Sequence, residues 1–174
     1  LLTTDRDAYG IYVQSPFPKE NRRILIGSDV SSRYTRRNRA EYRKIAGYIA
    51  RCVWQRQGNY MVFFPSYRLM EDVLQVYEEE FSVDWVRCVC QTPDMTEQER
   101  EGFLEEFQER EGTLVGFCVL GGIFSEGVDL TGESLIGAVI VGTGLPQIGS
   151  QREILKEYYD KKNHCGFDYA YRYP

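Results

Sequence analysis

The sequence predicts an α/β domain in which helices cover both faces of a mainly parallel sheet. Short apolar runs typical of buried strands alternate along the chain with segments of helical periodicity. With 174 residues, of which 43% are hydrophobic and 27% charged, the chain has the size and composition of one globular domain. We therefore expect a single three-layer domain over residues 1–174.

Two strands and two helices are expected in the first half of the chain. Ile24–Ile26 and Tyr60–Phe64 are short apolar runs that end at a glycine and a proline, as buried strands do. Between them, residues 38–54 carry apolar side chains at helical spacing. Ser66 can cap the next helix, whose expected inner face consists of Leu69, Val73, Leu74 and Tyr77.

The second half of the chain continues this alternation. Apolar runs predict strands at Val83–Cys90, Thr113–Leu120 and Ala138–Val141. Two capping boxes predict the starts of helices, formed by Thr96 with Glu99 and by Ser150 with Glu153. The apolar stripes expected behind them are Phe103, Leu104 and Phe107, and then Ile154, Leu155 and Tyr158.

Charge, hydropathy and cysteine content exclude several classes of protein. The net charge is −5, so any contact with nucleic acid must come from a local patch or from backbone amides. No apolar stretch is long enough to span a membrane and no signal peptide is evident, so we expect a cytoplasmic protein, associated with the nucleoid if bacterial. Five cysteines without a C-x-x-C pair favour reduced thiols in the core over disulfides or a zinc site.

Glycine-rich and polar segments follow three of the expected strands, where ligands of parallel sheets bind. These segments are Phe63–Tyr67, Gly121–Leu130 and Gly142–Pro146. Ser66 begins a helix whose free amides and dipole suit a phosphate, and a simple helix cap is the alternative. The second segment offers Ser125, Glu126 and Asp129 as polar groups, and an ordinary tight turn is the alternative.

Two nucleotide-binding signatures are missing from the chain. There is no G-x-x-x-x-G-K-[ST] motif, so the domain lacks a P-loop of its own. Gly142-Thr143-Gly144 begins like a dinucleotide fingerprint, but Gln147 occupies the position of the third glycine.

Four segments occur in a recognisable order: Ser15–Pro18 with Asn21, Val62–Tyr67, Gly122–Asp129 and Gly144–Pro146. In sequence and order they resemble the C-terminal half of XPD/DinG-type helicases of superfamily 2. The resemblance implies a RecA-like second motor lobe. It also implies that the chain ends before the family's final motif, a Gln and Gly-Arg-x-x-Arg segment, and the start at Leu1 fits such a fragment.

The resemblance further implies roles for particular residues. The residues that match motif V, at the junction of ATP and DNA, are Ser125, Glu126, Gly127 and Asp129. Phe64 and Ser66 match motif IV, near the DNA backbone. We therefore expect weak, sequence-independent phosphate contacts near Phe64, Ser66 and Ser125.

The resemblance also implies the activity and partners of the whole protein, an ATP-dependent 5′ to 3′ DNA helicase in repair or replication. The expected partners are single-stranded or forked DNA and the first lobe of the same polypeptide, and no membrane. That lobe would hold ATP and Mg²⁺ and, in many members, an iron–sulfur cluster. No catalytic residue is expected within this chain, which alone should not hydrolyse ATP.

Two other functions stay open at this point. One is a non-catalytic protein-interaction module that uses the helix near residues 150–162 as a docking surface. The other is a stand-alone nucleotide-dependent α/β enzyme, although the incomplete glycine fingerprint and the lack of a nucleophile–histidine pair argue against it.

Overall fold

The central element of the fold is a four-stranded sheet whose strands all run parallel, in the order β2-β3-β1-β4. The computed structural model describes residues 13–16, 18–108, 112–125, 128–142 and 149–173. The strands are β1 (Asn59–Phe64), β2 (Val86–Cys90), β3 (Thr113–Val119) and β4 (Gly137–Ile140). β1 and β3 lie at the centre and are almost entirely buried, which explains their continuous apolar sequences.

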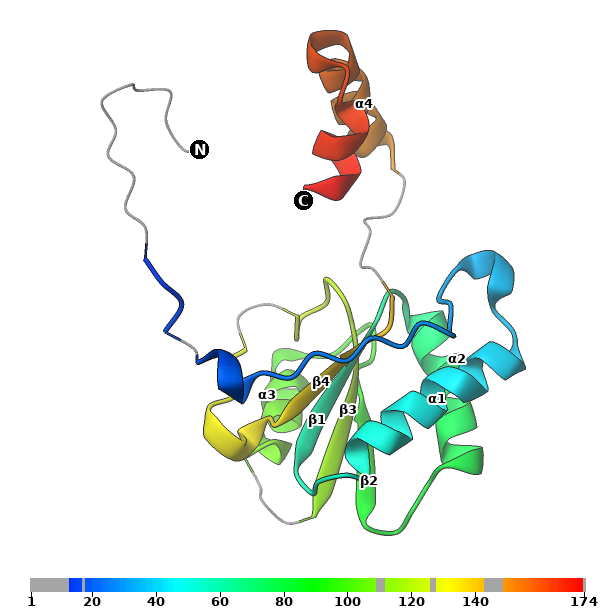
Figure 1. Ribbon diagram of the computed structural model, residues 1–174, viewed down its shortest axis with the longest axis vertical. Coiled ribbons are helices and arrows are strands. Elements are labelled where there is room, and N and C mark those ends of the chain that lie inside the picture. Colours follow the sequence, from blue (N-terminus) through cyan, green and yellow to red (C-terminus); the bar gives the residue numbers. More distant parts are fainter. Residues whose placement is uncertain (1–12, 17, 109–111, 126–127, 143–148, 174) are drawn as a thin grey trace.

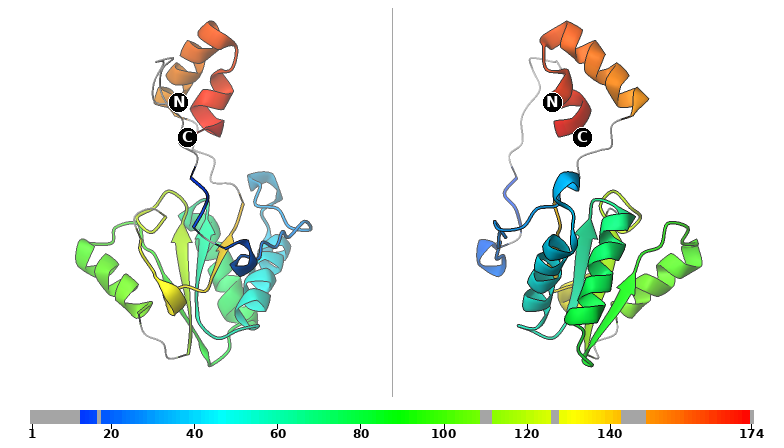
Figure 2. Two further views of the ribbon diagram at one scale, coloured as in Figure 1. Left: turned by 60° about the vertical axis from the view of Figure 1, so that its left-hand side comes forward. Right: turned by 90° about the vertical axis from the view of Figure 1, so that its right-hand side faces the viewer.

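Helices cover both faces of this sheet and make three layers (Figures 1 and 2). α1 (Arg39–Val53) and α2 (Tyr67–Glu80) pack on one face, and α3 (Glu97–Glu106) packs on the other. Side chains alternate along β1, so that Val62 belongs to the first core and Met61 to the second. The predicted three-layer α/β fold with a parallel sheet is confirmed.

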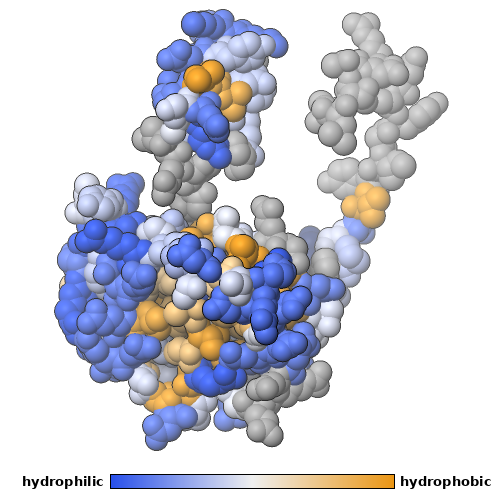
Figure 3. Space-filling model, turned by 180° about the vertical axis from the view of Figure 1, so that it is seen from behind, coloured by the Kyte–Doolittle hydropathy of each residue, from blue (hydrophilic) through white to orange (hydrophobic). Residues whose placement is uncertain are grey.

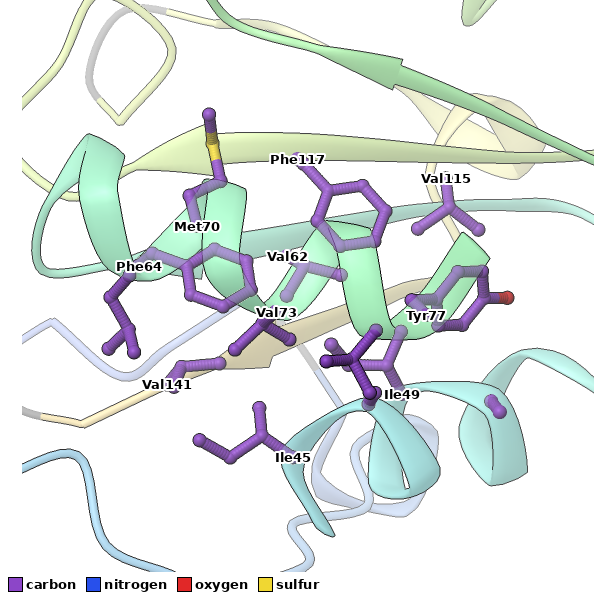
Figure 4. Close-up of a cluster of buried hydrophobic side chains, with 14 of the residues drawn as sticks. Ile45, Ile49, Val62, Phe64, Met70, Val73, Tyr77, Val115, Phe117 and Val141 are labelled. Atoms are coloured by element: carbon purple, nitrogen blue, oxygen red, sulfur yellow. The ribbon is translucent and has the colours of Figure 1, made fainter. Parts of the chain in front are cut away.

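The larger core lies between the sheet and the pair α1 and α2 (Figure 4). Phe64 and Phe117 stack with ring centroids 5.9 Å apart, and the edge of Tyr77 meets Phe117 at 5.8 Å. All three side chains are at most 1% exposed. Burial of an aromatic side chain of this size stabilises a fold by about 1.5–3 kcal/mol, so this cluster is a principal source of stability.

α2 forms where the spacing of apolar residues predicts it. The hydroxyl oxygen of Ser66 accepts a hydrogen bond from the Leu69 amide at 3.4 Å and so caps the helix. Leu69, Val73 and Tyr77 are buried as expected, and Leu74 is only partly buried. The helix therefore faces the sheet along a stripe wider than the predicted one, and the additional buried residues are Met70 and Val76.

Side-chain caps also begin the other two helices of the sheet layers. Asn38 caps α1 by accepting from the Glu41 amide at 3.1 Å. At α3, the Thr96 hydroxyl accepts from the Glu99 amide at 3.3 Å, while the Glu99 carboxylate accepts from the Thr96 amide at 2.8 Å. This reciprocal pair is the capping box that the sequence predicts.

Ile24–Ile26 do not form the predicted strand. Their side chains are 70–87% exposed, and within the described residues no strand pairs with them. An apolar run becomes a strand only where a ladder and a packed face stabilise it, and here the run passes the sheet without either. β2 also differs slightly from expectation, because Val83 lies in a turn before Val86.

α4 (Ser150–Asn163) begins without the predicted capping box. Its N-cap is Gly149, and Ser150 is already inside the helix with no capping hydrogen bond. The Glu153 carboxylate instead accepts from the Tyr171 hydroxyl, in a short π-helix called η4 (Asp168–Arg172). α4 therefore packs against η4, and Tyr159 stacks on Tyr169 with centroids 4.1 Å apart.

The apolar stripe predicted for α4 is not buried. Ile154, Leu155 and Tyr158 are 68%, 39% and 56% exposed, because α4 and η4 stand away from the sheet and its cores (Figure 1). Figure 3 shows apolar surface on this C-terminal helical unit. None of the helices in the described ranges combines the length and apolar character needed to cross a bilayer.

Gly116→Ala in β3 should lower the free energy of unfolding by about 1–3 kcal/mol, because overpacking a tight core forces neighbours to shift. The added Cβ would lie 2.7 Å from Cζ of Phe107 and 3.1 Å from Cζ of Phe103. Urea denaturation measures the change. Gly102→Ala is the matched control, since nothing lies within 4 Å of its added Cβ, and helix propensity should make it stabilising by up to about 1 kcal/mol. Unchanged stability of Gly116→Ala would contradict the packing described.

Candidate functional site

The loops that follow β1, β3 and β4 meet at the carboxyl edge of the sheet, which is the upper edge in Figure 1. Backbone hydrogen bonds continue beyond the ends of the strands and join these loops. The Leu120 amide donates to the Phe64 carbonyl at 2.8 Å, and the Val141 amide donates to the Phe63 carbonyl at 2.8 Å. The first two segments selected from the sequence, and the start of the third at Gly142, are therefore neighbours at one edge, where parallel sheets bind ligands.

Phe64 lies below this edge and inside the core. Its side chain is 0% exposed and stacks on Phe117. It is therefore closed to nucleic acid, which corrects the prediction of a contact at Phe64. The buried Phe64 side chain instead fixes the end of β1, just before the start of α2.

Ser66 occupies the first position after this buried strand end. It is half-buried, and its hydroxyl oxygen caps α2. This is the helix-cap role that the sequence left as an alternative. The cap leaves Ser66 at the amino end of a 14-residue helix, whose dipole favours an anion.

A tight turn holds Ser125 after β3. The Ser125 hydroxyl donates to the Gly122 carbonyl at 2.7 Å, and its amide donates to the same oxygen at 3.0 Å. Phe124 anchors the turn, since it is 2% exposed and stacks on Phe103 at 4.3 Å. Gly121 adopts φ +72°, a conformation that glycine reaches without strain.

Asp129 is exposed, and none of the described residues hydrogen-bonds to its carboxylate. These residues therefore show no hydrogen bond by which the Asp129 carboxylate would stabilise its own loop, which was the alternative role. Glu126 and Gly127 lie outside the described residues, as do Thr143 to Ile148. Of the four motif V residues, the structure describes Ser125, in the turn after β3, and Asp129, farther along the same loop.

Gln91 is a residue of this edge that sequence reasoning missed. It is 2% exposed, and its backbone amide extends the ladder by donating to the Phe117 carbonyl at 2.8 Å. Its side-chain oxygen accepts from the Val119 amide at 3.0 Å, and its side-chain nitrogen donates to the Tyr67 hydroxyl at 2.9 Å. A single buried amide therefore connects the end of β3 to the first turn of α2.

Gly122 must be small because of this glutamine. A Cβ at Gly122 would lie 2.7 Å from the side-chain nitrogen of Gln91 and 2.9 Å from the Val119 carbonyl oxygen. The glycine of the motif V turn and the buried Gln91 are thus parts of one packing arrangement. A lone glutamine after a strand gives no signal in the sequence, since its partners come from distant segments.

An apolar hollow of about 220 Å³ adjoins Ser125 on the α3 side of the sheet. Its lining consists of Met61, Phe63, Phe124, Ser125, Val128, Leu130 and Leu135. Apart from Ser125, these side chains offer no polar group to a phosphate or a nucleotide. The chemistry of the edge therefore lies in its loops rather than in this hollow.

Two of the cysteines, Cys88 and Cys118, have the properties of packed thiols. Burial raises the pKa of Cys118 to about 12 and that of Cys88 to about 11, so both are protonated at neutral pH. Cys90 is exposed. Within the described ranges, no group of three or more potential ligands is arranged to hold a metal ion.

A parallel sheet whose loops gather at its carboxyl edge places this chain among the α/β domains that bind ligands at that edge. Residues 49–174 match the family model described as the helicase C-terminal domain. The chain belongs to this family. The membership supports the helicase interpretation over the stand-alone enzyme.

Individual relatives agree with this assignment. The chain is 28% identical over 155 residues to a probable ATP-dependent helicase of Methanocaldococcus jannaschii, a match that covers 86% of this chain and 23% of the relative. A solved structure of apo XPD matches with a TM-score of 0.62 and 22% identity over 83% of this chain and 28% of that one. A structure of an XPD helicase matches with a TM-score of 0.63 and 23% identity over 84% and 25%. The chain thus has the XPD fold and spans about a quarter of the length of these relatives.

Gln91→Leu should lower the free energy of unfolding by about 1–3 kcal/mol, because the volume is kept while the buried Val119 amide loses its acceptor. Chemical denaturation of the purified chain measures this change. Gln75→Leu is the matched control, since Gln75 is exposed on α2 and bonds only to Glu79 among the described residues. Surface changes of this kind stay within about 0.5 kcal/mol, and equal effects of the two variants would contradict the role of Gln91.

Proposed function

We propose that this chain is the second motor lobe of an ATP-dependent helicase that moves along single-stranded DNA. The proposal rests on one observation. The motif IV and motif V loops begin side by side at one edge of a sheet that has the XPD fold. Ligands of parallel sheets bind at such an edge. In a two-lobed motor this edge would face the cleft that holds ATP and nucleic acid.

Within this proposal, the motif V loop couples ATP to DNA through Ser125, Glu126, Gly127 and Asp129. The exposed Asp129 carboxylate is available to a hydroxyl or a cation from outside the loop. Ser66 lies at the amino end of α2, where an anionic backbone phosphate is stabilised by free amides and the helix dipole. Phe64 acts indirectly, by fixing the strand end from which Ser66 projects.

ATP and Mg²⁺ would be held mainly by the first lobe, because this chain has no P-loop. The proposed direction of movement is 5′ to 3′, and the proposed setting is DNA repair or replication on single-stranded or forked DNA. The resemblance to the XPD/DinG family supports each of these assignments. An iron–sulfur cluster would belong to the first lobe and not to this chain.

Asp129→Asn in the full-length helicase should reduce DNA unwinding at least tenfold while the melting temperature changes by less than about 2 °C. The substitution keeps the size of the side chain and removes the charge that the proposal assigns to the ATP–DNA junction. Unwinding of a forked duplex and a thermal melt are measured on the same preparation.

Glu133→Gln provides the control for Asp129→Asn. Glu133 is also an exposed carboxylate of this loop, and it pairs with Arg56 on the surface at 2.8 Å. Exposed pairs contribute about 0–1 kcal/mol, so unwinding should be unchanged. A stability loss in Asp129→Asn with full unwinding per folded molecule would remove Asp129 from the site.

The isolated chain should show no ATPase activity, with or without single-stranded DNA. The 174 residues lack the P-loop that holds the β and γ phosphates in such motors. A phosphate-release assay on the purified chain tests this expectation. Stimulated hydrolysis that disappears in the Asp129→Asn chain would show that catalysis resides here after all.

A further inference from the structure

The loop before α1 concentrates positive charge on a protein whose net charge is −5. It contains the short 3₁₀ turn η2 (Tyr34–Arg36), and the arginines in and around it are Arg33, Arg36, Arg37 and Arg39. Figure 2 shows the loop above the carboxyl edge of the sheet, beside the amino ends of α1 and α2. Neither motif IV nor motif V includes it.

A buried carboxylate holds this loop in place. Glu41 is 6% exposed, and it accepts from the Ser31 amide at 2.9 Å and from the Lys44 ammonium at 3.3 Å. The Ser31 hydrogen bond keeps the pKa of Glu41 below its ordinary value, so the group stays ionised. The loop is thus attached to α1 by a hydrogen bond to the buried, ionised Glu41 carboxylate, and not by exposed side chains.

The loop also touches the edge that carries the motifs. Gly142, the second residue after β4, adopts φ +85°, and a Cβ there would clash with the Ser32 side chain. Ser32 and the end of β4 are therefore in direct contact. The Ser32 carbonyl in turn accepts from the Arg37 guanidinium at 3.3 Å, which ties the basic loop to the carboxyl edge.

The arginines around this loop divide into paired and unpaired groups. Arg39 pairs with Glu79 at 2.8 Å, and Arg36 approaches Glu41 at 3.6 Å. Among the described residues, no carboxylate lies within ion-pair distance of Arg33, Arg37 or Arg68. In the part of the chain that the structure describes, these three guanidinium groups therefore have no direct ion-pair partner, although the Asp72 carboxylate acts on the same Tyr42 hydroxyl as Arg37 and Arg68.

Arg37 and Arg68 lie at the amino ends of two helices, α1 and α2, that pack against each other. Arg37 precedes α1 and packs over the Tyr34 ring at 5.5 Å, while Arg68 is exposed in the first turn of α2. Burial and the Asp72 carboxylate raise the pKa of Tyr42, and both arginines lower it, so both charges lie near this hydroxyl. Arg68 is also two positions from Ser66, the proposed phosphate contact of motif IV.

We propose that Arg33, Arg37 and Arg68 form a second phosphate-binding surface that extends the nucleic-acid path from Ser66 toward α1. This proposal rests on the proposed helicase function and adds a contact that motifs IV and V do not contain. The ligand is the sugar–phosphate backbone of a single strand, because the three cations continue from Ser66, the proposed phosphate contact of motif IV, and Arg68 lies two positions from it. Guanidinium groups suit phosphate oxygens through paired N–H donors.

The test measures binding of the full-length helicase to fluorescein-labelled oligothymidine by anisotropy across a series of salt concentrations. The variant carries Arg33→Ala, Arg37→Ala and Arg68→Ala together. Loss of three phosphate contacts should make the slope of log K against log salt shallower by about 2 and weaken binding on the order of 100-fold at about 0.1 M salt. The matched control removes the same charge at the amino edge of the sheet, with Arg51→Ala, Arg56→Ala and Arg87→Ala, and should keep the original slope.

A second variant guards against effects on folding, because Arg37 also bonds within its loop. Arg33→Glu with Arg68→Glu leaves Arg37 intact and changes only exposed side chains, and it should weaken binding at least as strongly. Unchanged slope and affinity in both variants would overturn this surface while leaving the helicase function intact. An equal loss in the amino-edge control would also overturn it, as an effect of overall charge. Failure of the unaltered helicase to bind oligothymidine at low salt would overturn the proposed function as well.

Discussion

The hydrogen-bonded ladder between β1 and β3 continues one residue past both strands, where the Leu120 amide meets the Phe64 carbonyl. A parallel ladder can extend in this way only if both strands end at the same level. The motif IV and motif V loops therefore leave the sheet side by side, and the Val141 bond to Phe63 adds the β4 loop to them. The positions of Ser66 and of the turn that holds Ser125 follow from this common edge.

Two buried polar side chains stabilise the backbone behind this edge. Gln91 joins the end of β3 to α2, and Glu41 joins the basic loop to α1. Both satisfy backbone amides that would otherwise be costly to bury. Because these inner groups hold the loops, exposed groups such as Asp129 and Arg33 need make no structural bonds and remain available to ligands.

Local sequence patterns predicted most of the fold because helix caps and the spacing of apolar residues are local properties. The α2 stripe and the Thr96–Glu99 box followed from spacing alone. The errors arose where a local pattern lacked its tertiary partner: Ile24–Ile26 found no strand to pair with, and the apolar stripe of α4 found no core. At the candidate site, the local pattern could not tell that Phe64 points inward or that Gln91 is buried.

The contact between Ser32 and Gly142 has a consequence for where this folding unit begins. The family match starts at residue 49, in the middle of α1, yet Ile45 and Ala46 are buried core residues upstream of that point. The missing side chain of Gly142 leaves space that Ser32, in the segment before α1, fills. The smallest fragment that folds on its own must therefore include Ser31, whose backbone amide donates a hydrogen bond to the Glu41 carboxylate. A boundary drawn from family similarity alone would divide a helix and open the core to water.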